Sequence, residues 1–337
     1  MFQKLMLVMF LLATAACQPK FTPQSTQVPE YRRPQRVLPT IRILDAGLTP
    51  RAPLRYRVPP GASETVYLEL VRAQALRVGN EGGQSGMPPI QLQVQMGPSE
   101  PTPEGFIRHP LKITQLRIAN EAQKMSPAQR EQMEKTLAPL LHVEGWSEMD
   151  IQGRVRRSEF RGLEDVPPDL IAMLGNIRTA LLTVPFPDEP LGVRSRWEVE
   201  RKIQLSGFWA DQVATYHIVK MDRNQIELQI AARQSATPQS LANGRLEAYQ
   251  VSVIGSAVVR LDSLSAFSEA EATSQMRIQQ RTGSGSQLLQ VDSRTMVRLY
   301  PADAGKPLAE EAPEQDAVDQ EDANVITDPG KQKLKWR

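Results

Sequence analysis

Apolar and polar residues alternate with a period of two through most of the chain after residue 54. In the first such segment Val66, Leu68 and Leu70 alternate with polar or aromatic neighbours. This period places successive side chains on opposite faces of a strand and predicts strands with one buried face, about ten in all. The alternation recurs in segments 90–96, 111–118, 149–155, 197–205, 216–230, 246–261, 265–280 and 288–299.

Two segments instead show the spacing of an amphipathic helix. The first follows Ser126, a helix N-cap residue, and Pro127, which suits the first helical position; Pro139 should end or kink this helix. The second begins near Pro167 and stops before Pro185. The apolar stripes are Met133, Leu137, Leu140 and Leu141 in the first helix and Leu170, Met173, Leu174, Ile177 and Leu181 in the second.

Together these elements predict an α+β fold. Strands that expose one polar face favour an antiparallel sheet covered on one side. We expect a large curved antiparallel β-sheet, a half-barrel or open sandwich, with the two main helices on its concave face. Turn residues at 222–224, 243–244 and 283–285 should connect the later strands. The strand-rich part, residues 54–300, is predicted to be a single domain.

The N-terminus has the layout of a secretion signal. Lys4 precedes an apolar run from Leu5 to Leu12, which is too short to span a membrane as a mature helix, for which about 20 residues are needed. Small residues follow, and then Cys17, the single cysteine of the chain. The pattern predicts a signal peptide over residues 1–16.

Residues 14–17, Thr-Ala-Ala-Cys, resemble the lipobox of bacterial lipoproteins, although Thr14 stands where that family usually has leucine. The resemblance implies cleavage after Ala16 and a diacylglycerol anchor with palmitate-like chains on Cys17, which would make the membrane a partner through the lipid. Two or more acyl chains anchor a protein stably. Gln18, in place of the aspartate that marks inner-membrane retention, implies the outer membrane, with the body facing the periplasm. Ordinary signal cleavage after Ala15 or Ala16 remains the alternative.

Two weaker resemblances concern the body of the chain. The segment from Pro187 to Trp197, leading to Gly207 and Tyr216, resembles a set of uncharacterised bacterial lipoproteins in which a proline and glycine turn precedes a strand pair that carries a tryptophan. The predicted plan of helices in a curved sheet is similar to the half-barrels that carry lipoproteins across the periplasm. This second likeness is an analogy of fold and implies no function.

Both arms of the chain are polar. Residues 17–53 are rich in proline and arginine and predict an extended, lipid-anchored linker, whereas residues 301–337 carry nine acidic and five basic side chains and predict a disordered tail. The net charge of the whole chain is only +2. Because the middle of the chain is balanced in sign and the leader exports the protein, the sequence argues against a nucleic-acid partner.

Motifs for catalysis are missing from the sequence. The three histidines have no zinc-like spacing, and neither Ser85 nor Ser284 lies in a Gly-x-Ser-x-Gly motif. We therefore predict no catalytic residue, no cofactor and no metal. The acidic pairs Glu164–Asp165 and Asp188–Glu189 could meet other carboxylates, which geometry has to decide. Four aromatic residues could line an apolar pocket or, more simply, fill the core, namely Trp146, Trp197, Phe208 and Trp209.

The sequence is best explained by a non-enzymatic outer-membrane lipoprotein that binds an apolar ligand or an envelope partner on its curved sheet. One alternative is a structural or assembly accessory that docks to a larger envelope complex, which would require an exposed sheet edge or apolar patch. A hydrolase with an unrecognised carboxylate site is the other alternative.

Overall fold

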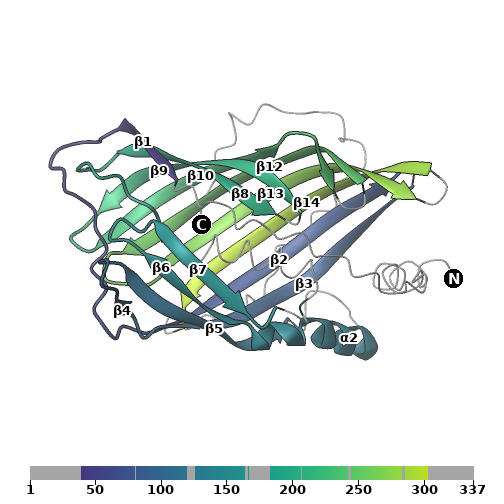
Figure 1. The fold of residues 1–337 in the computed structure, drawn as a ribbon, viewed down its shortest axis with the longest axis horizontal. Coiled ribbons are helices and arrows are strands. Elements are labelled where there is room, and N and C mark those ends of the chain that lie inside the picture. Colours follow the sequence, from purple (N-terminus) through teal and green to yellow (C-terminus); the bar gives the residue numbers. More distant parts are fainter. Residues whose placement is uncertain are drawn as a thin grey trace. The chain divides into compact units, whose positions relative to one another are not determined.

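The computed structural model describes residues 39–79, 81–119, 126–163, 166, 183–205, 207–241, 244–282 and 285–302 (Figure 1). Of these residues 66% lie in strands and 7% in helices. The fold is therefore mostly β, and the predicted α+β class with two main helices is wrong. The predicted signal peptide with Ala16, the linker up to residue 38 with Cys17, and the tail from residue 303 lie outside the described residues.

The described residues form fourteen strands in one sheet, with one α-helix and one 3₁₀ helix. The strands are β1 Thr40–Asp45, β2 Glu64–Val78, β3 Glu81–Met96, β4 Glu100–Pro101, β5 Ile107–Ile118, β6 Glu144–Met149, β7 Val155–Arg161, β8 Arg196–Leu205, β9 Phe208–Met221, β10 Gln225–Ala236, β11 Gln239–Leu241, β12 Gly244–Arg260, β13 Ala266–Thr282 and β14 Gly285–Pro301. The helices are α2 Pro127–Leu137 and η1 Ala138–His142.

Every strand pair in the sheet is antiparallel, as expected from the one-sided alternation. The strand order is β1-β8-β9-β10-β12-β13-β14-β2-β3-β5-β6-β7, with β4 beside β5 and β11 beside β12. The last strand thus pairs with β2, which joins the N-terminal and C-terminal halves into one continuous sheet. In Figure 1 the long strands β12, β13, β14, β2 and β3 run side by side through the middle of this sheet.

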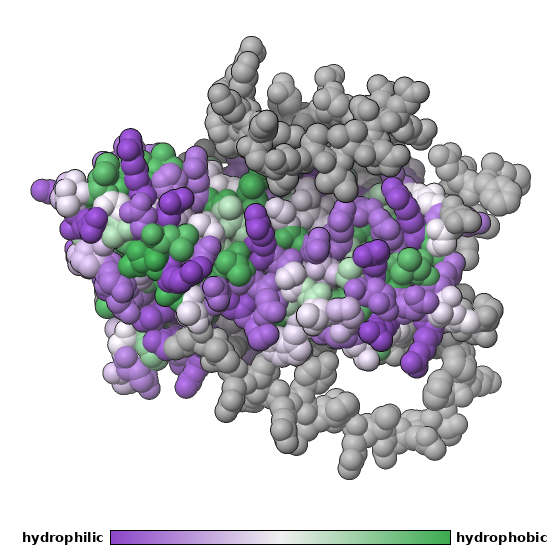
Figure 2. Space-filling view, turned by 90° about the horizontal axis from the view of Figure 1, so that it is seen from above, coloured by the Kyte–Doolittle hydropathy of each residue, from purple (hydrophilic) through white to green (hydrophobic). Residues whose placement is uncertain are grey.

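The strand register separates an inner and an outer face. We call inner the face that carries the aligned residues Leu228, Ala257, Ser268, Leu299, Leu68 and Leu92 of β10, β12, β13, β14, β2 and β3. The outer face carries cross-strand ion pairs such as Arg298–Glu269 and Arg294–Glu271. Figure 2 shows hydrophilic side chains spread over the surface it presents, with hydrophobic residues in small separate groups between them. The outer face is thus suited to water.

Two apolar cores lie on the inner face. The first core joins β2, β3 and β5 through residues such as Leu68 and Leu92. The second core contains Trp197 and is packed against by Ile43 of β1 and Val155 of β7, the strands at the two ends of the sheet order. Side-chain packing therefore brings the two ends of the sheet to one core, and among the described residues no hydrogen-bonded pair joins β1 to β7.

The predicted first helix exists, but it does not cover the inner face. Ser126 caps α2 through a capping box with Gln129, as its sequence signature suggests. Of the residues of α2 only Leu137 is buried, and Leu140 of η1 packs beside it in the first core. The helix therefore contributes its last turn to the core and exposes the rest. The predicted second helix, from residue 167 to 181, lies outside the described residues.

Two further segments differ from the predicted pattern. Residues 150–154 form the turn between β6 and β7, whereas the alternation over residues 149–155 had predicted one strand. Residues 40–45, within the segment interpreted as a linker, form β1, which pairs with Arg196–Glu200 of β8. Among the described residues, no helix has both the length and the apolar character needed to cross a membrane.

Candidate ligand-binding face

Neither Cys17 nor Ala16, the site residues predicted from the sequence, lies among the described residues. The three histidines are among the described residues, and each has a different environment. Nδ1 of His217 in β9 lies 3.5 Å from the side-chain oxygen of Gln229 in the neighbouring strand β10, and His142 is exposed at the end of η1. His109 is buried, and burial lowers its pKa to about 4. The described residues contain no group of three or more residues able to hold a metal ion.

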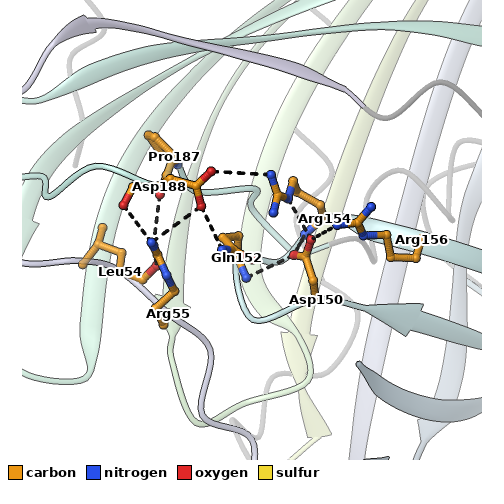
Figure 3. A network of polar contacts seen from close by, with 8 residues as sticks. All are labelled: Leu54, Arg55, Asp150, Gln152, Arg154, Arg156, Pro187 and Asp188. Atoms are coloured by element: carbon orange, nitrogen blue, oxygen red, sulfur yellow. Dashed lines mark hydrogen bonds and ion pairs between the residues drawn. The ribbon is translucent and has the colours of Figure 1, made fainter. Parts of the chain in front are cut away.

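Arginine and aspartate side chains form a polar network that joins the β6–β7 turn to residues 54–55 and 187–188 (Figure 3). Asp150 is 5% exposed and directly follows β6. One of its carboxylate oxygens accepts hydrogen bonds from the backbone N–H groups of Gln152, at 3.1 Å, and Arg154, at 2.9 Å. The other lies 2.7 Å from Nε of Arg154 and 3.2 Å from a guanidinium nitrogen of Arg156. Asp150 therefore holds the β6–β7 turn.

Asp188, from the predicted acidic pair Asp188–Glu189, extends this network to two more segments, whereas the pair Glu164–Asp165 lies outside the described residues. Its side chain accepts a 2.9 Å hydrogen bond from Gln152, and it lies 3.9 Å from Arg154 and 3.7 Å from Arg55. Arg55 also donates to the backbone carbonyl oxygens of Pro187 and Asp188. The network thus ties residues 54–55, 150–156 and 187–188 together (Figure 3). Carboxylates held this way by guanidinium groups are suited to fixing loops, so we assign the network a structural role.

A strip in which five of nine side chains are glycine or alanine, called here the small-residue strip, crosses the inner face beyond the second core. Two adjacent rows of aligned positions form it, one through β10, β12, β13 and β14 at Ile230, Gly255, Ala270 and Val297, the other through β9, β10, β12, β13 and β14 at Ala214, Ala232, Val253, Ala272 and Thr295. Most of these residues are half-buried, in contrast to the fully buried second core. Gly255 admits no side chain, because a Cβ atom there would lie 2.5 Å from the carbonyl oxygen of Glu269.

A polar row borders the strip on the side away from the second core. Arg201 of β8, Gln212 of β9 and Gln234 of β10 are aligned on the inner face, and Nε of Arg201 donates a hydrogen bond to Gln212. Tyr249 of β12 donates a 2.9 Å hydrogen bond from its hydroxyl to Gln234. Burial lowers the pKa of Arg201 and raises that of Tyr249 to about 12. These groups are therefore partly removed from water.

A third apolar group follows this polar row toward the far end of the strands. It contains Phe208 and Leu246, and Tyr249 packs against Phe208 with ring centroids 5.0 Å apart. Along the strands the inner face thus runs from the second core through the small-residue strip and the polar row to a third apolar group. Such a surface can hold an elongated apolar molecule and can meet one polar group on it.

The sheet is open where this surface lies. β1 pairs with β8 only as far as Glu200, and β5 pairs with β3 only from Ile90 onward. Among the described residues, Arg201–Leu205 of β8 and residues 81–89 of β3 therefore have no strand on their second side. The strip and the third apolar group lie between these two unpaired edges.

Sequence reasoning missed this surface. Its residues belong to segments whose alternation was recognised, but the small side chains of Gly255, Ala270 and Ala272 were not distinguished from core residues. The usable signal was the small size of these side chains, because small inward-facing residues in two adjacent long strands leave space above a sheet. Of the four aromatic residues considered, Trp197 is fully buried, whereas Trp209 is 42% exposed.

No protein-family model and no curated protein matches this chain. Among solved structures, the outer membrane protease OmpT from Escherichia coli is similar over 76% of this chain and 99% of its own, with 7% identity and a TM-score of 0.22. OccK2 (OpdF) from Pseudomonas aeruginosa is similar over 71% of this chain and 97% of its own, with 8% identity and a TM-score of 0.16. The first is thus a weak structural resemblance to an outer-membrane protein, and scores this low do not establish a shared fold.

Proposed function

We propose that this protein is a non-enzymatic, lipid-anchored outer-membrane protein whose inner sheet face binds an apolar ligand. The observation that carries the proposal is the half-buried strip of small residues between the second core and the third apolar group. A sheet stabilised only by packing would fill this position with large side chains, because interiors are packed closely. Small residues here suit a surface that a ligand completes.

The two end strands of the sheet, β1 and β7, are poorly suited to docking by strand addition. The edge strand β1 is only six residues long and carries Arg42, which pairs with Glu198. The opposite edge strand, β7, carries the exposed residues Arg157, Glu159 and Arg161. Short or charged edge strands resist pairing with another chain. Docking by strand addition at β1 or β7 therefore has less support than a ligand on the inner face, and the unpaired stretches of β8 and β3 flank that face.

Binding is tested directly with a neutral apolar probe. The full chain carrying Cys17→Ser, which needs no detergent, is titrated with N-phenyl-1-naphthylamine, and its fluorescence gain is measured. We expect saturable binding that a long-chain alcohol displaces. Absence of saturable binding, together with recovery of a specific envelope protein by crosslinking in cells, would replace this proposal with the accessory role.

The anchor is tested separately. We expect the native protein to sediment with the membrane fraction and the Cys17→Ser variant to remain soluble in the periplasm, because acyl chains supply the membrane affinity. Mass spectrometry of the mature N-terminus should show a diacylated cysteine. An unmodified N-terminus on protein recovered from the native envelope would contradict the lipoprotein assignment while leaving the ligand-binding proposal intact.

A further inference from the structure

We propose that the ligand is a single-chain amphiphile with a carboxylate head group, a long-chain fatty acid, whose head group binds Arg201 while its chain lies along the small-residue strip. This inference rests on the proposed function and names its ligand class. The observation that supports this inference is the position of one cation, Arg201, in the polar row that borders the small-residue strip.

Among the described residues, the surroundings of Arg201 leave its charge poorly compensated. Its side chain is half-buried on the inner face, and its hydrogen bond among the described residues is to the neutral amide of Gln212. Among those residues, no ion pair joins it to a carboxylate, in contrast to Arg294 and Arg298 on the outer face. Removing a cation from water is costly unless an anion is near it. A bound carboxylate would supply that anion.

The chemistry of the guanidinium group suits this ligand. Nε of Arg201 is engaged by Gln212, which orients the planar group from one side. The two terminal nitrogens of a guanidinium can then donate a pair of parallel hydrogen bonds to one carboxylate. Neighbouring polar groups are Gln234 and the hydroxyl of Tyr249. The site therefore offers neutral hydrogen-bonding groups around one cation, which favours a singly charged head group.

The dimensions of the strip suit one acyl chain. Its two rows are separated by two residues along each strand, about 7 Å, which is the width of a single hydrocarbon chain with its contacts. It crosses β9, β10, β12, β13 and β14, and four strand spacings amount to about 19 Å. This length is comparable to a long fatty acyl chain. Arg201 lies on β8, one inward-facing position beyond Val199, which is aligned with Ala214 at the β9 end of this path, and Arg72 lies on β2, at the other end.

Arg72 is a weaker candidate for the same head group. It is aligned with Thr295 at the β2 end of the strip and acts electrostatically on Tyr249. Its side chain is exposed, so water screens its charge more than that of Arg201. We therefore assign the head group to Arg201 and expect Arg72 to contribute less.

The test compares two probes that differ only in head-group charge. The full chain with Cys17→Ser is titrated at pH 7.5 with 11-(dansylamino)undecanoic acid and with its methyl ester. We expect the acid to bind about tenfold more tightly, as for a charged hydrogen-bonded pair. In Arg201→Gln the acid should bind only as tightly as the ester, whereas Arg201→Lys should retain part of the preference.

Arg233→Gln is the matched control, because Arg233 lies exposed on the outer face of β10. It removes the same charge and should leave both affinities unchanged. Equal affinity of acid and ester in the chain without an arginine substitution, or an equal loss of both in Arg201→Gln, would overturn the head-group assignment while the proposed function stands. If neither probe binds, the proposed function fails and this inference fails with it.

Discussion

The indole nitrogen of Trp197 donates a 2.9 Å hydrogen bond to the main-chain carbonyl oxygen of Pro185. The same ring is fully buried and stacks on Tyr216 with centroids 5.3 Å apart. Trp197 therefore joins β8 and β9 to the segment that contains Pro185. Because Tyr216 is aligned with Ile230, this contact also borders one row of the small-residue strip.

Trp197→Phe should destabilise the fold by about 2–3 kcal/mol, because it leaves a cavity and removes the hydrogen bond to Pro185. The measurement is guanidinium chloride unfolding followed by circular dichroism. Trp209→Phe is the control, since Trp209 is 42% exposed and should change the free energy of unfolding by less than about 0.5 kcal/mol. Similar losses in both variants would contradict the role given to Trp197.

Asp150→Asn should destabilise the fold by about 3 kcal/mol, because Arg154 and Arg156 then lose the carboxylate that compensates them in a buried site. Asp188→Asn should cost less than about 1 kcal/mol, because the Asp188 side chain is 67% exposed and its ion pairs are screened. Urea unfolding of the two variants measures the difference. A larger loss of stability in Asp188→Asn would show that Asp188, and not Asp150, is the main stabilising aspartate of the network.

Stability should fall in mild acid because of His109. Its pKa is about 4 in the folded protein, against an ordinary value of 6.5. The unfolded chain therefore binds a proton at this position before the folded chain does. The resulting stability is fully present above about pH 6.5 and is lost as the pH falls toward 4, by up to about 1.4 kcal/mol per pH unit.

His109→Gln should remove this part of the pH dependence, as measured by urea midpoints at pH 7.5, 6.0 and 5.0. His142→Gln is the control, because His142 is exposed at the end of η1 and should leave the pH dependence unchanged. An unchanged pH profile in His109→Gln would show that other groups cause the acid sensitivity.

Ala272→Phe should weaken binding of the neutral naphthylamine probe roughly tenfold, equivalent to about 1.4 kcal/mol, because the ring occupies the small-residue strip. Thr273→Phe places the same ring on the outer face of the same strand and should leave the affinity unchanged. Probe titration with a thermal melt of each variant makes the comparison. Equal affinities in the two variants would place the ligand elsewhere.

Local features of the structure could be predicted from the sequence where neighbouring residues decide them. Ser126 caps α2, as predicted from its place before Pro127, and Asp222 pairs with Gln225 across the predicted β9–β10 turn. The strand alternation was recognised because a period of two is a property of the strand itself. Where the alternation crossed a turn, at residues 149–155, it misled, because Asp150 and Arg154 form contacts that only the folded turn shows.

The candidate site could not be predicted in the same way. Cys17 and Ala16 were recognised as a processing signal, which is linear along the chain. Arg201, Gly255 and Ala272 come from three different strands, and only the register of β8 to β13 brings them to one face. The first helix was predicted to cover the inner face of the sheet, but α2 buries only its last turn.

The sequence by itself determined that this protein is built from long antiparallel strands with one polar and one apolar face, because side-chain alternation depends only on the local backbone. Tertiary structure alone decided how those strands are ordered, with β14 beside β2, and which residues meet on the inner face. The physical reason is that strand pairing and core packing join residues far apart in the chain. No local pattern specifies which distant strand becomes the neighbour.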